Sequence, residues 1–447
     1  MKPSIPRTKL LYTFWVLICA VFAVVIFVNG TSKTQLPTLK DRSEALAKNT
    51  EWPETQANYQ QLIKELEAKP NDSRSLLKLA KLFMNEARAS GDYSYYNKSA
   101  LTIIDQVLTS EPGNFEAICL KSMVFLSQHR FAEAKTVAEE ALKVNPYNSF
   151  VYGLLVDASV EMGDYARAIE MCDKMVSIRP DIRSYSRVSY LREIHGEVSA
   201  SIDAIEQAIA AGVPGHEDTE WARMVLAHLY EDSNQLLAAK AQYEISLHFR
   251  PDYPFALAGL GRIARYQHDY PGAIQYFEKA SAVMNDVAFY DELIELYQLN
   301  GQPEKSKTCF KAVETSLISD NTSGKKDKKS GHNADYELAQ LYIKGQDFAK
   351  GLVHAKAEYD RRPENIDAAE IYAWALYLNN RFEEADQVMQ TALRTNSMKP
   401  ERLVKAGIIR MARSENEAGK SLIDKGIELK PYMDSDLREL ATSFVKR

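Results

Sequence analysis

The sequence is poor in residues that interrupt helices and in residues that form covalent cross-links. Among 447 residues there are 19 Gly, 16 Pro and four Cys, and no Cys-x-x-Cys occurs. Strand-like alternation bounded by turn residues is nearly absent, which predicts an all-α chain. Cys119, Cys172 and Cys309 are scattered along the chain. An odd number could leave a free thiol, but we expect all three to be small apolar core residues.

Signatures of common catalytic and metal sites are missing too. The sequence contains no Gly-x-Ser-x-Gly, no Walker-type phosphate loop, no His-Glu-x-x-His and no Cys or His cluster with metal-ligand spacing. The eight His are dispersed singly, and we expect His129, His195, His268 and His354 to be surface or packing residues. The sequence therefore predicts no enzyme, no cofactor and no metal.

Charge of one sign does not accumulate either. The formal net charge is −6, and no long acidic or basic run is present. A nucleic-acid-binding surface is normally basic. We therefore expect no nucleic-acid partner.

The chain has instead a repeat of about 34 residues that begins near Ser73 and continues to the C-terminus. Pro146 and Pro180 are one period apart, and Pro363 and Pro431 are two periods apart. Each unit has the apolar spacing of two short amphipathic helices separated by a Gly, Asn or His break. Small residues spaced by seven would let neighbouring helices pack closely; they are Ala134 with Ala141, Ala273 with Ala280, and Ala385 with Ala392.

This pattern resembles the tetratricopeptide repeat, whose unit carries an aromatic residue, a Leu-Gly or Leu-Ala pair, a Tyr, two Ala and a closing Pro. One unit has Leu226, Ala227, Tyr230, Ala239, Tyr243 and Pro251 in these positions, and another has Leu338, Ala339, Tyr342 and Pro363. The resemblance covers over four fifths of the chain. It implies a surface for proteins or peptides. A chaperone-peptide clamp is not expected, because its Lys and Asn pair is missing.

The fold expected is an all-α, right-handed superhelical solenoid of about ten such helix-turn-helix units, preceded by one transmembrane helix. The units should begin near Ser73, Phe115, Ser149, Ile182, Glu220, Pro254, Val287, His332, Ile366 and Pro400. The predicted order is a cytosolic N-terminus (1–9), a transmembrane signal anchor (10–28), a tether (29–54), an N-terminal capping helix (55–72), units one to seven (73–318), a Lys-rich loop (319–331), units eight to ten (332–433) and a C-terminal capping helix (434–447).

The proposed anchor, Leu10 to Val28, has no charge in 19 residues. At about 1.5 Å per residue it spans roughly 28 Å, close to the thickness of a hydrocarbon core. Lys2, Arg7 and Lys9 precede it, so the N-terminus should remain cytosolic and the repeats should be extracytoplasmic, in a bacterial periplasm. The alternative is a cleaved signal peptide, which would give a secreted soluble carrier, although the apolar stretch exceeds the usual 7–15 residues.

The Lys-rich segment Ser319 to Gly331 contains Gly, Ser and four Lys in place of the helical pattern. It could dock an acidic partner or anionic lipid headgroups. We favour the alternative that it is a solvated insertion between units.

The concave face should be lined by the first helices of successive units. Placing the units in register gives Arg183, Tyr190, Glu193, Trp221, His228, Glu231, Phe255, Arg262, Arg265, Asp291, Glu295, Tyr336, Trp374 and Tyr377 as inward residues. Aromatic and Arg side chains anchor protein interfaces, and Arg262 with Arg265, three apart on one helix face, could hold a carboxylate in bidentate fashion. The alternative is that Trp221 and Phe255 pack between repeats and the charges solvate the groove.

These observations together predict a membrane-anchored scaffold of the cell envelope, whose groove binds an extracytoplasmic protein or peptide and assists complex assembly. A competing hypothesis is a glycan- or peptide-modifying enzyme. It would use the groove carboxylates Glu193, Glu231, Asp291 and Glu295 as acid and base.

Overall fold

The computed structural model describes residues 36–42, 47, 51–326, 332–433 and 435–445. Contacts divide the chain into two compact parts, residues 1–40 and Asp41–Arg447. The predicted N-terminus (1–9), the predicted anchor (10–28) and most of the tether (29–54) lie outside the described residues. No helix in the described ranges is long and apolar enough to cross a membrane.

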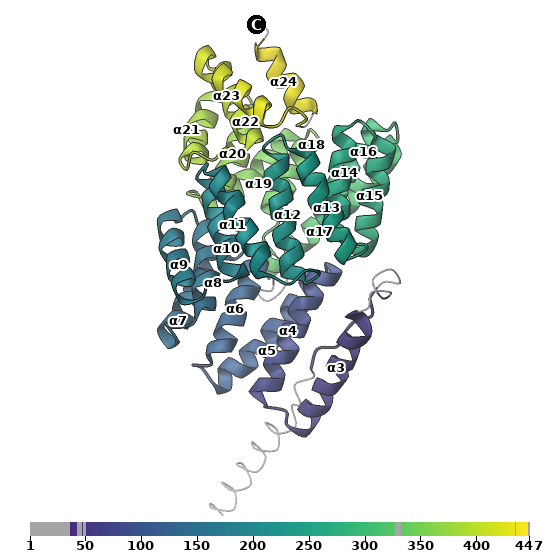
Figure 1. Cartoon of the computed structure of the whole chain (residues 1–447), viewed down its shortest axis with the longest axis vertical. Coiled ribbons are helices and arrows are strands. Elements are labelled where there is room, and N and C mark those ends of the chain that lie inside the picture. The colour runs from purple at the N-terminus through teal and green to yellow at the C-terminus, as the bar shows by residue number, and fades with distance from the viewer. Residues whose placement is uncertain (1–35, 43–46, 48–50, 327–331, 434, 446–447) are drawn as a thin grey trace, which may run out of the picture. The chain divides into compact units, whose positions relative to one another are not determined.

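The described residues of the larger part form 22 helices and no strand (Figure 1). The helix α3 (Glu51–Ala68) precedes ten helix pairs, and α24 (Ser435–Val445) follows them. The first helices of the pairs are α4 (Ser73–Ser90), α6 (Phe115–Ser127), α8 (Ser149–Glu161), α10 (Ile182–Ile194), α12 (Glu217–Glu231), α14 (Pro254–Tyr266), α16 (Val287–Leu299), α18 (Asp335–Lys344), α20 (Ile366–Leu378) and α22 (Pro400–Ala412). The second helices are α5 (Tyr93–Ser110), α7 (Phe131–Val144), α9 (Tyr165–Ile178), α11 (Val198–Ala211), α13 (Leu236–Phe249), α15 (Tyr270–Val283), α17 (Pro303–Lys326), α19 (Phe348–Arg361), α21 (Phe382–Leu393) and α23 (Asn416–Leu429).

Eight of the ten first helices begin at the residues that the repeat pattern predicts. The other two are displaced by three residues, since α12 begins at Glu217 and α18 at Asp335. The pairs of Ala spaced by seven are completely buried. Their small side chains allow the close approach of neighbouring helices that the repeat requires.

Local sequence explains where each helix starts and stops. The side chain of an Asp or Asn accepts a backbone N–H at the start of ten of these helices. Between the two helices of every unit, one residue has a positive φ and ends the first helix. These turn residues are Gly91, His129, Gly163, Gly196, Asn234, His268, Gly301, Gln346, Asn380 and Ser414.

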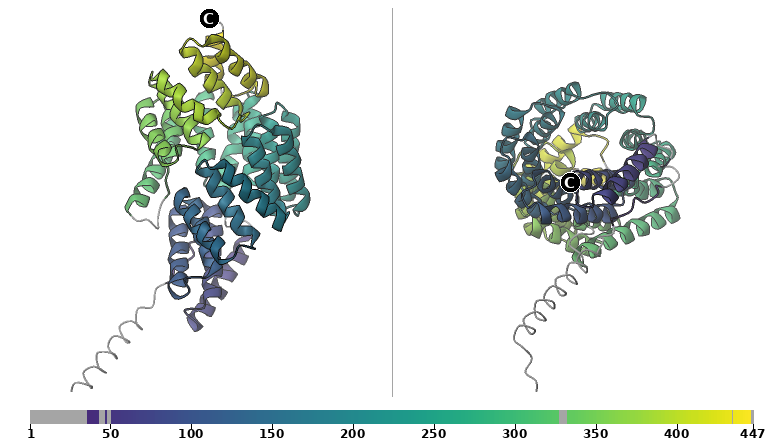
Figure 2. Two further views of the ribbon diagram at one scale, coloured as in Figure 1. Left: turned by 90° about the vertical axis from the view of Figure 1, so that its left-hand side faces the viewer. Right: turned by 90° about the horizontal axis from the view of Figure 1, so that it is seen from below.

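The ten units wind into a superhelix, and seen along its axis the helices form a ring (Figure 2). Successive superhelical turns touch each other, with units one to four lying against units seven to ten, six places further along. Unit two meets unit eight where the N–H of Asn333 donates to the carbonyl of Gln128 at 3.1 Å. Unit three meets unit nine where the N–H of Ile366 donates to the hydroxyl of Tyr165 at 3.0 Å. We call this contact between successive turns of the superhelix the axial contact.

Glycine at the inter-helix turn allows the backbones of two turns to meet directly. Gly163 has φ of 76°, and a Cβ added there would lie 2.2 Å from the carbonyl oxygen of Glu364 and 2.7 Å from the nitrogen of Asn365. The guanidinium of Arg394 donates to the Gly163 carbonyl at 2.5 Å. Gly196 makes the same close approach to Asn396, with a carbonyl oxygen 2.4 Å from an added Cβ.

The predicted N-terminal cap (55–72) and the end of the tether have different boundaries. The capping helix α3 begins at Glu51 and ends at Ala68. Trp52 is buried at 6% exposure, and the guanidinium of Arg42 lies 4.8 Å from its ring centroid. Arg42 also pairs with the buried Glu86 at 2.5 Å. Residues assigned to the tether are therefore part of the folded body.

The predicted Lys-rich loop (319–331) is wrong at its start, because α17 continues through Lys326. Its extra turns have specific partners that the composition does not indicate. The hydroxyl of Ser94 donates to Asp320 at 2.7 Å, and the amide of the buried Asn321 donates to Asp335 at 2.9 Å. Residues 327–331 lie outside the described ranges.

The axial contact predicts different effects for the same substitution at two equivalent turn positions. Gly301 has φ of 68°, and no atom lies within 4 Å of an added Cβ. We expect Gly301→Ala to cost about 1–2 kcal/mol for its left-handed backbone. Gly163→Ala should cost about 1–3 kcal/mol more, because the methyl group would overlap the backbone of Glu364.

Urea unfolding of the two variants and the parent protein measures this difference. Equal destabilisation by both substitutions would mean that the turns of the superhelix are not in contact at Gly163.

Candidate functional site

The inner face of units five and six carries a bidentate ion pair. Arg262 on α14 donates to both carboxylate oxygens of Glu231 on α12, at 3.0 and 3.1 Å. Its Nη2 also lies 2.6 Å from Nε2 of His228 and 2.8 Å from the hydroxyl of Tyr243. Since a guanidinium can only donate, His228 accepts through Nε2 and is the neutral imidazole.

The electrostatics of this group agree with its hydrogen bonds. Burial alone would raise the pKa of Glu231, but the adjacent Arg262 and the Tyr243 hydroxyl lower it to about 2. Burial, reinforced by the charge of Arg262, lowers the pKa of His228 to about 4. At neutral pH the site therefore holds one carboxylate, one guanidinium and one neutral imidazole.

A second ion-pair cluster follows on the next units. Arg265 contacts Glu292 at 3.1 Å and also pairs with Glu295. Lys344 on α18 contacts Asp291 at 2.6 Å and Glu295 at 3.7 Å. Both guanidinium groups predicted to hold a ligand carboxylate thus contact carboxylates of this chain, and a ligand would have to displace them.

The C-terminal segment of the chain covers part of the predicted groove. Lys430 donates to Asp232 at 2.7 Å and contacts Glu401 at 2.8 Å. The hydroxyl of Tyr432 donates to the backbone carbonyl of Glu231, and its ring centroid lies 4.5 Å from that of Tyr266. The segment therefore contacts the groove at units five and six, where Tyr266 in turn bonds Glu231 at 3.2 Å.

The predicted aromatic residues belong mainly to the packing between repeats. Trp221, Phe255 and Phe289 occupy the same position in three successive units, and their ring centroids are 5.1 and 5.8 Å apart. Phe289 is buried, whereas Trp221 at the end of this row is 45% exposed. Trp374 is only 9% exposed and stacks on Tyr377 at 4.9 Å. Trp374 therefore belongs to the hydrophobic core of the last three units and not to the groove.

The remaining predicted groove residues, within the described ranges, share no hydrogen bond or ion pair with one another. Arg183 is exposed. Tyr190 is 38% exposed, yet burial by the surrounding helices raises the pKa of its hydroxyl. Tyr336 lies 6.0 Å from the guanidinium of Arg362, and burial raises its pKa as well.

The four carboxylates of the enzyme hypothesis differ in protonation chemistry. Glu231, Asp291 and Glu295 are ion-paired to Arg or Lys. Burial and the neighbouring Asp232 raise the pKa of Glu193 to about 7, although Lys399 opposes the shift. Glu193 could therefore exchange a proton near neutral pH, while Glu231 stays ionised.

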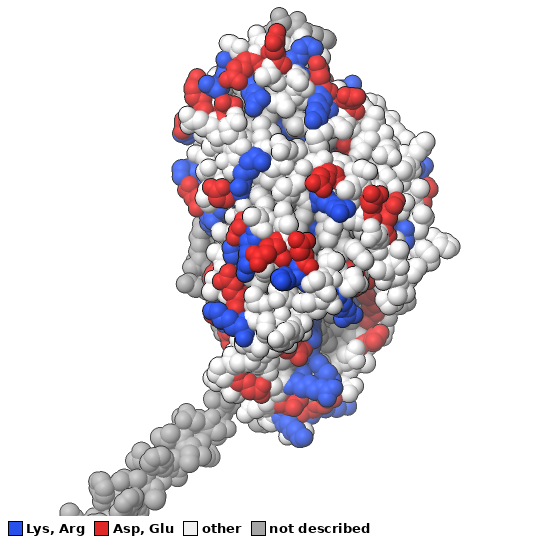
Figure 3. All heavy atoms as spheres, turned by 60° about the vertical axis from the view of Figure 1, so that its left-hand side comes forward, with Lys and Arg blue, Asp and Glu red and all other residues white. Residues whose placement is uncertain are grey.

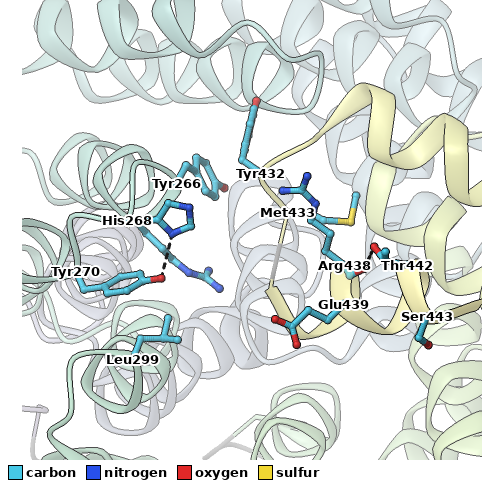
Figure 4. Close-up of a pocket in the computed structure, with 11 residues that line it drawn as sticks. Tyr266, His268, Tyr270, Leu299, Tyr432, Met433, Arg438, Glu439, Thr442 and Ser443 are labelled. Carbon is cyan, nitrogen blue, oxygen red and sulfur yellow. Dashed lines mark hydrogen bonds between the residues drawn. The ribbon is translucent and has the colours of Figure 1, made fainter. Parts of the chain in front are cut away.

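An open cleft of about 650 Å³ lies beside the covered part of the groove (Figure 4). One wall comes from the end of α14, the turn before α15 and the end of α16; the other comes from residues 432–433 and α24. The lining residues are Arg265, Tyr266, His268, Tyr270, Leu299, Tyr432, Met433, Arg438, Glu439, Thr442 and Ser443. Among the described residues, Arg438 and Glu439 have no ion-pair partner. Of this set the repeat register predicted only Arg265, because it treated α24 as a simple cap.

The molecular surface around the superhelix shows no patch of a single sign on the face drawn in Figure 3, where basic and acidic side chains are interspersed. The chain also has exposed ion pairs along single helices, such as Arg381 with Glu384. Pairs of this kind contribute little to stability or specificity. The cleft is therefore distinguished by its shape and its aromatic side chains.

The raised pKa of Glu193 predicts a pH-dependent effect of Glu193→Gln. The folded protein binds this proton more tightly than the unfolded chain, whose carboxyl has the ordinary value of 4.5. Its contribution to stability is complete below pH 4.5 and is lost as the pH rises through about 7. The variant should gain up to about 3 kcal/mol in the free energy of unfolding at pH 8, and nothing at pH 4.

Urea unfolding at both pH values tests this expectation, with the exposed Glu197→Gln as control. An equal effect of Glu193→Gln at pH 4 and pH 8 would contradict it.

Comparison with known proteins identifies the repeat. Models described as the tetratricopeptide repeat match residues 125–192, 224–286 and 336–398. No curated protein matches the sequence.

Solved structures that are similar to the chain, at low sequence identity, include the following three. The TPR protein TTC0263 of Thermus thermophilus is 19% identical, with 41% of this chain and 94% of that chain covered and a TM-score of 0.37. PilW, titled a widely conserved type IV pilus biogenesis factor, is 16% identical, with 46% and 94% covered and a TM-score of 0.38. Yeast Tom70 is 11% identical, with 90% and 94% covered and a TM-score of 0.37.

The matched segments fall on units two to four, units five and six, and units eight and nine, where the structure has helix pairs and positive-φ turns. These segments of the chain are tetratricopeptide repeats.

Proposed function

We propose that this chain is a membrane-anchored protein-interaction scaffold whose working surface is the cleft between α14–α16 and α24. The proposal rests on one observation: this hollow of about 650 Å³ combines Tyr266, Tyr270 and Tyr432 with Arg438, which has no ion-pair partner in the described part of the chain. Tyr and Arg are enriched among the residues that dominate binding energy at protein interfaces.

The chemistry of the cleft favours a peptide segment that carries a carboxylate next to an apolar or aromatic side chain. Arg438 lies on the exposed α24 wall and would provide the bidentate donor for that carboxylate. Leu299, which is 39% exposed, and the ring of Tyr270 offer apolar area on the opposite wall. Arg265, with Glu292 and Glu295 as its partners, would add a fixed polar boundary.

The walls of the cleft are held in place before any partner arrives. Tyr266 hydrogen-bonds to Glu231 and stacks on Tyr432, and Lys430 is tied to Asp232. His268 lies 3.1 Å from the hydroxyl of Tyr270. A preformed surface loses little conformational freedom on binding, which lowers the free-energy cost of association.

The location of the scaffold is a further part of the proposal and rests on the sequence. An uncharged stretch of 19 residues follows Lys2, Arg7 and Lys9. We propose that it anchors the protein with the repeats outside the cytosol. The repeats would then present the cleft to a protein of the cell envelope. They would assist assembly of a complex there.

A charge-reversal variant in the cleft should reduce partner capture. We expect a photoreactive residue at Leu299 to crosslink a discrete partner in cells, and Arg438→Glu to reduce that yield at least tenfold by placing two carboxylates together. Mass spectrometry of the crosslinked product identifies the partner and measures the yield.

Two matched controls accompany this experiment. A photoreactive residue at Leu237, which is 86% exposed on α13, samples a surface outside the cleft. Arg74→Glu changes the same charge at an exposed position on α4. Equal capture from Leu299 and Leu237, or equal losses with Arg438→Glu and Arg74→Glu, would rule out the cleft as the working surface.

Removal of residues 1–30 should release the protein from membranes. The intact chain should remain in the membrane fraction after a carbonate wash, because transfer of its apolar segment to water is unfavourable. Immunoblotting of the fractions, with N-terminal sequencing of the mature protein, measures this. Recovery of the intact chain in the soluble fraction, or a mature N-terminus after Gly30, would favour the secreted carrier instead.

A further inference from the structure

Two His and one Glu from distant parts of the chain meet at the axial contact. His129 is the turn residue of unit two, His332 precedes α18, and Glu337 lies in its first turns. One potential ligand atom from each of the three lies within 4.8 Å of the other two. Nδ1 of His129 is 3.5 Å from Oε1 of Glu337, and the two imidazole centroids are 5.2 Å apart.

The backbone on both sides of this cluster is fixed by hydrogen bonds. The amide group of Asn333 donates to the carbonyl of His129 at 2.9 Å, and the N–H of Asn333 donates to the carbonyl of Gln128 at 3.1 Å. The ring of His129 also stacks on Phe131, with centroids 5.5 Å apart. The three side chains therefore approach one another from two anchored segments.

The side chains are of types that bind metal ions. A neutral imidazole nitrogen and a carboxylate oxygen are both ligands of Zn²⁺. Oε2 of Glu337 is buried and has no hydrogen-bond partner among the described residues. A buried carboxylate oxygen without a partner is uncommon, and a bound ion would satisfy it.

We propose that His129, His332 and Glu337 bind a Zn²⁺ ion that joins two successive turns of the superhelix. Two imidazole nitrogens and one carboxylate oxygen form a known zinc ligand set, with the fourth position open to water. Zn–N bonds of about 2.0–2.1 Å in tetrahedral geometry require ligand atoms about 3.3–3.5 Å apart. A separation of 4.8 Å must therefore shorten by about 1.3–1.5 Å, through rotation of the side chains.

A supporting carboxylate lies behind the proposed ligands. Oδ2 of Asp320 is 3.7 Å from Nδ1 of His332, and the hydroxyl of Ser94 donates to Asp320 at 2.7 Å. Metal-bound His commonly holds a carboxylate through its second nitrogen, which fixes the ring orientation. The side chain of His129 is 34% exposed, so an ion can enter from solvent.

Nearby cations do not cancel the attraction for a divalent ion. Arg362 is paired with Glu161 and Glu358, and Arg361 is paired with Asp335 and Glu358. Their charges are therefore matched by carboxylates outside the cluster. Glu337 and Asp320 supply the negative charge next to the proposed metal.

Zinc titration of the full-length, tag-free protein by isothermal titration calorimetry tests this proposal. We expect one Zn²⁺ per chain. His129→Asn, His332→Gln and Glu337→Gln should each weaken binding by more than the roughly 10–100-fold that loss of a supporting hydrogen bond causes. His129→Asn preserves the turn, because Asn234 and Asn380 occupy the equivalent position with the same backbone.

Two further measurements keep the result interpretable. Exposed His216→Ala should bind Zn²⁺ like the parent, and Co²⁺ bound to the parent should show the visible spectrum of tetrahedral coordination. Zinc should raise the melting temperature of the parent but not of the three ligand variants. Absence of saturable binding at one ion per chain, or binding unchanged in His129→Asn and His332→Gln, would overturn the proposal.

Discussion

Contact between successive turns of the superhelix is the constraint on which the rest of this structure depends. In an open solenoid each unit touches only its neighbours. Here unit two also lies against unit eight and unit three against unit nine, through Gln128 with Asn333 and Tyr165 with Ile366. The contact joins residues about 200 positions apart. The superhelix is therefore stabilised along its axis as well as between neighbouring units.

Burial of the charged side chains on the first helices explains why they pair with one another. A charge removed from water is costly unless an opposite charge and hydrogen bonds accompany it. Arg262 with Glu231 and Lys430 with Asp232 meet this requirement within the chain. Binding to that face would require exchange of these internal pairs for external ones. The cleft beside α24 makes no such demand, since Arg438 is exposed and unpaired among the described residues.

The repeat period predicted the helix pairs, their turns and eight of ten starting residues because these depend on local sequence. Nothing local indicated that Gly163 meets Glu364 or that α17 continues to Lys326, because both depend on partners far away in the chain. The register placed Arg262 and Arg265 on a first helix, and both lie on α14. It could not show that the carboxylates paired with these two Arg side chains belong to the chain itself. Nor could it show that His129 lies beside His332. Single histidines separated by some 200 residues have no spacing that a motif could report.

The six-unit register also bears on how this chain can change in length. A solenoid without axial contact can gain or lose one unit by duplication or deletion, at the expense of one interface. In this superhelix such an event between units three and nine would advance every later unit by one position around the ring. Gly163 would then face the wrong turn, and the backbone that it admits would meet a side chain. The number of units between two contacting turns is therefore fixed by the axial contact.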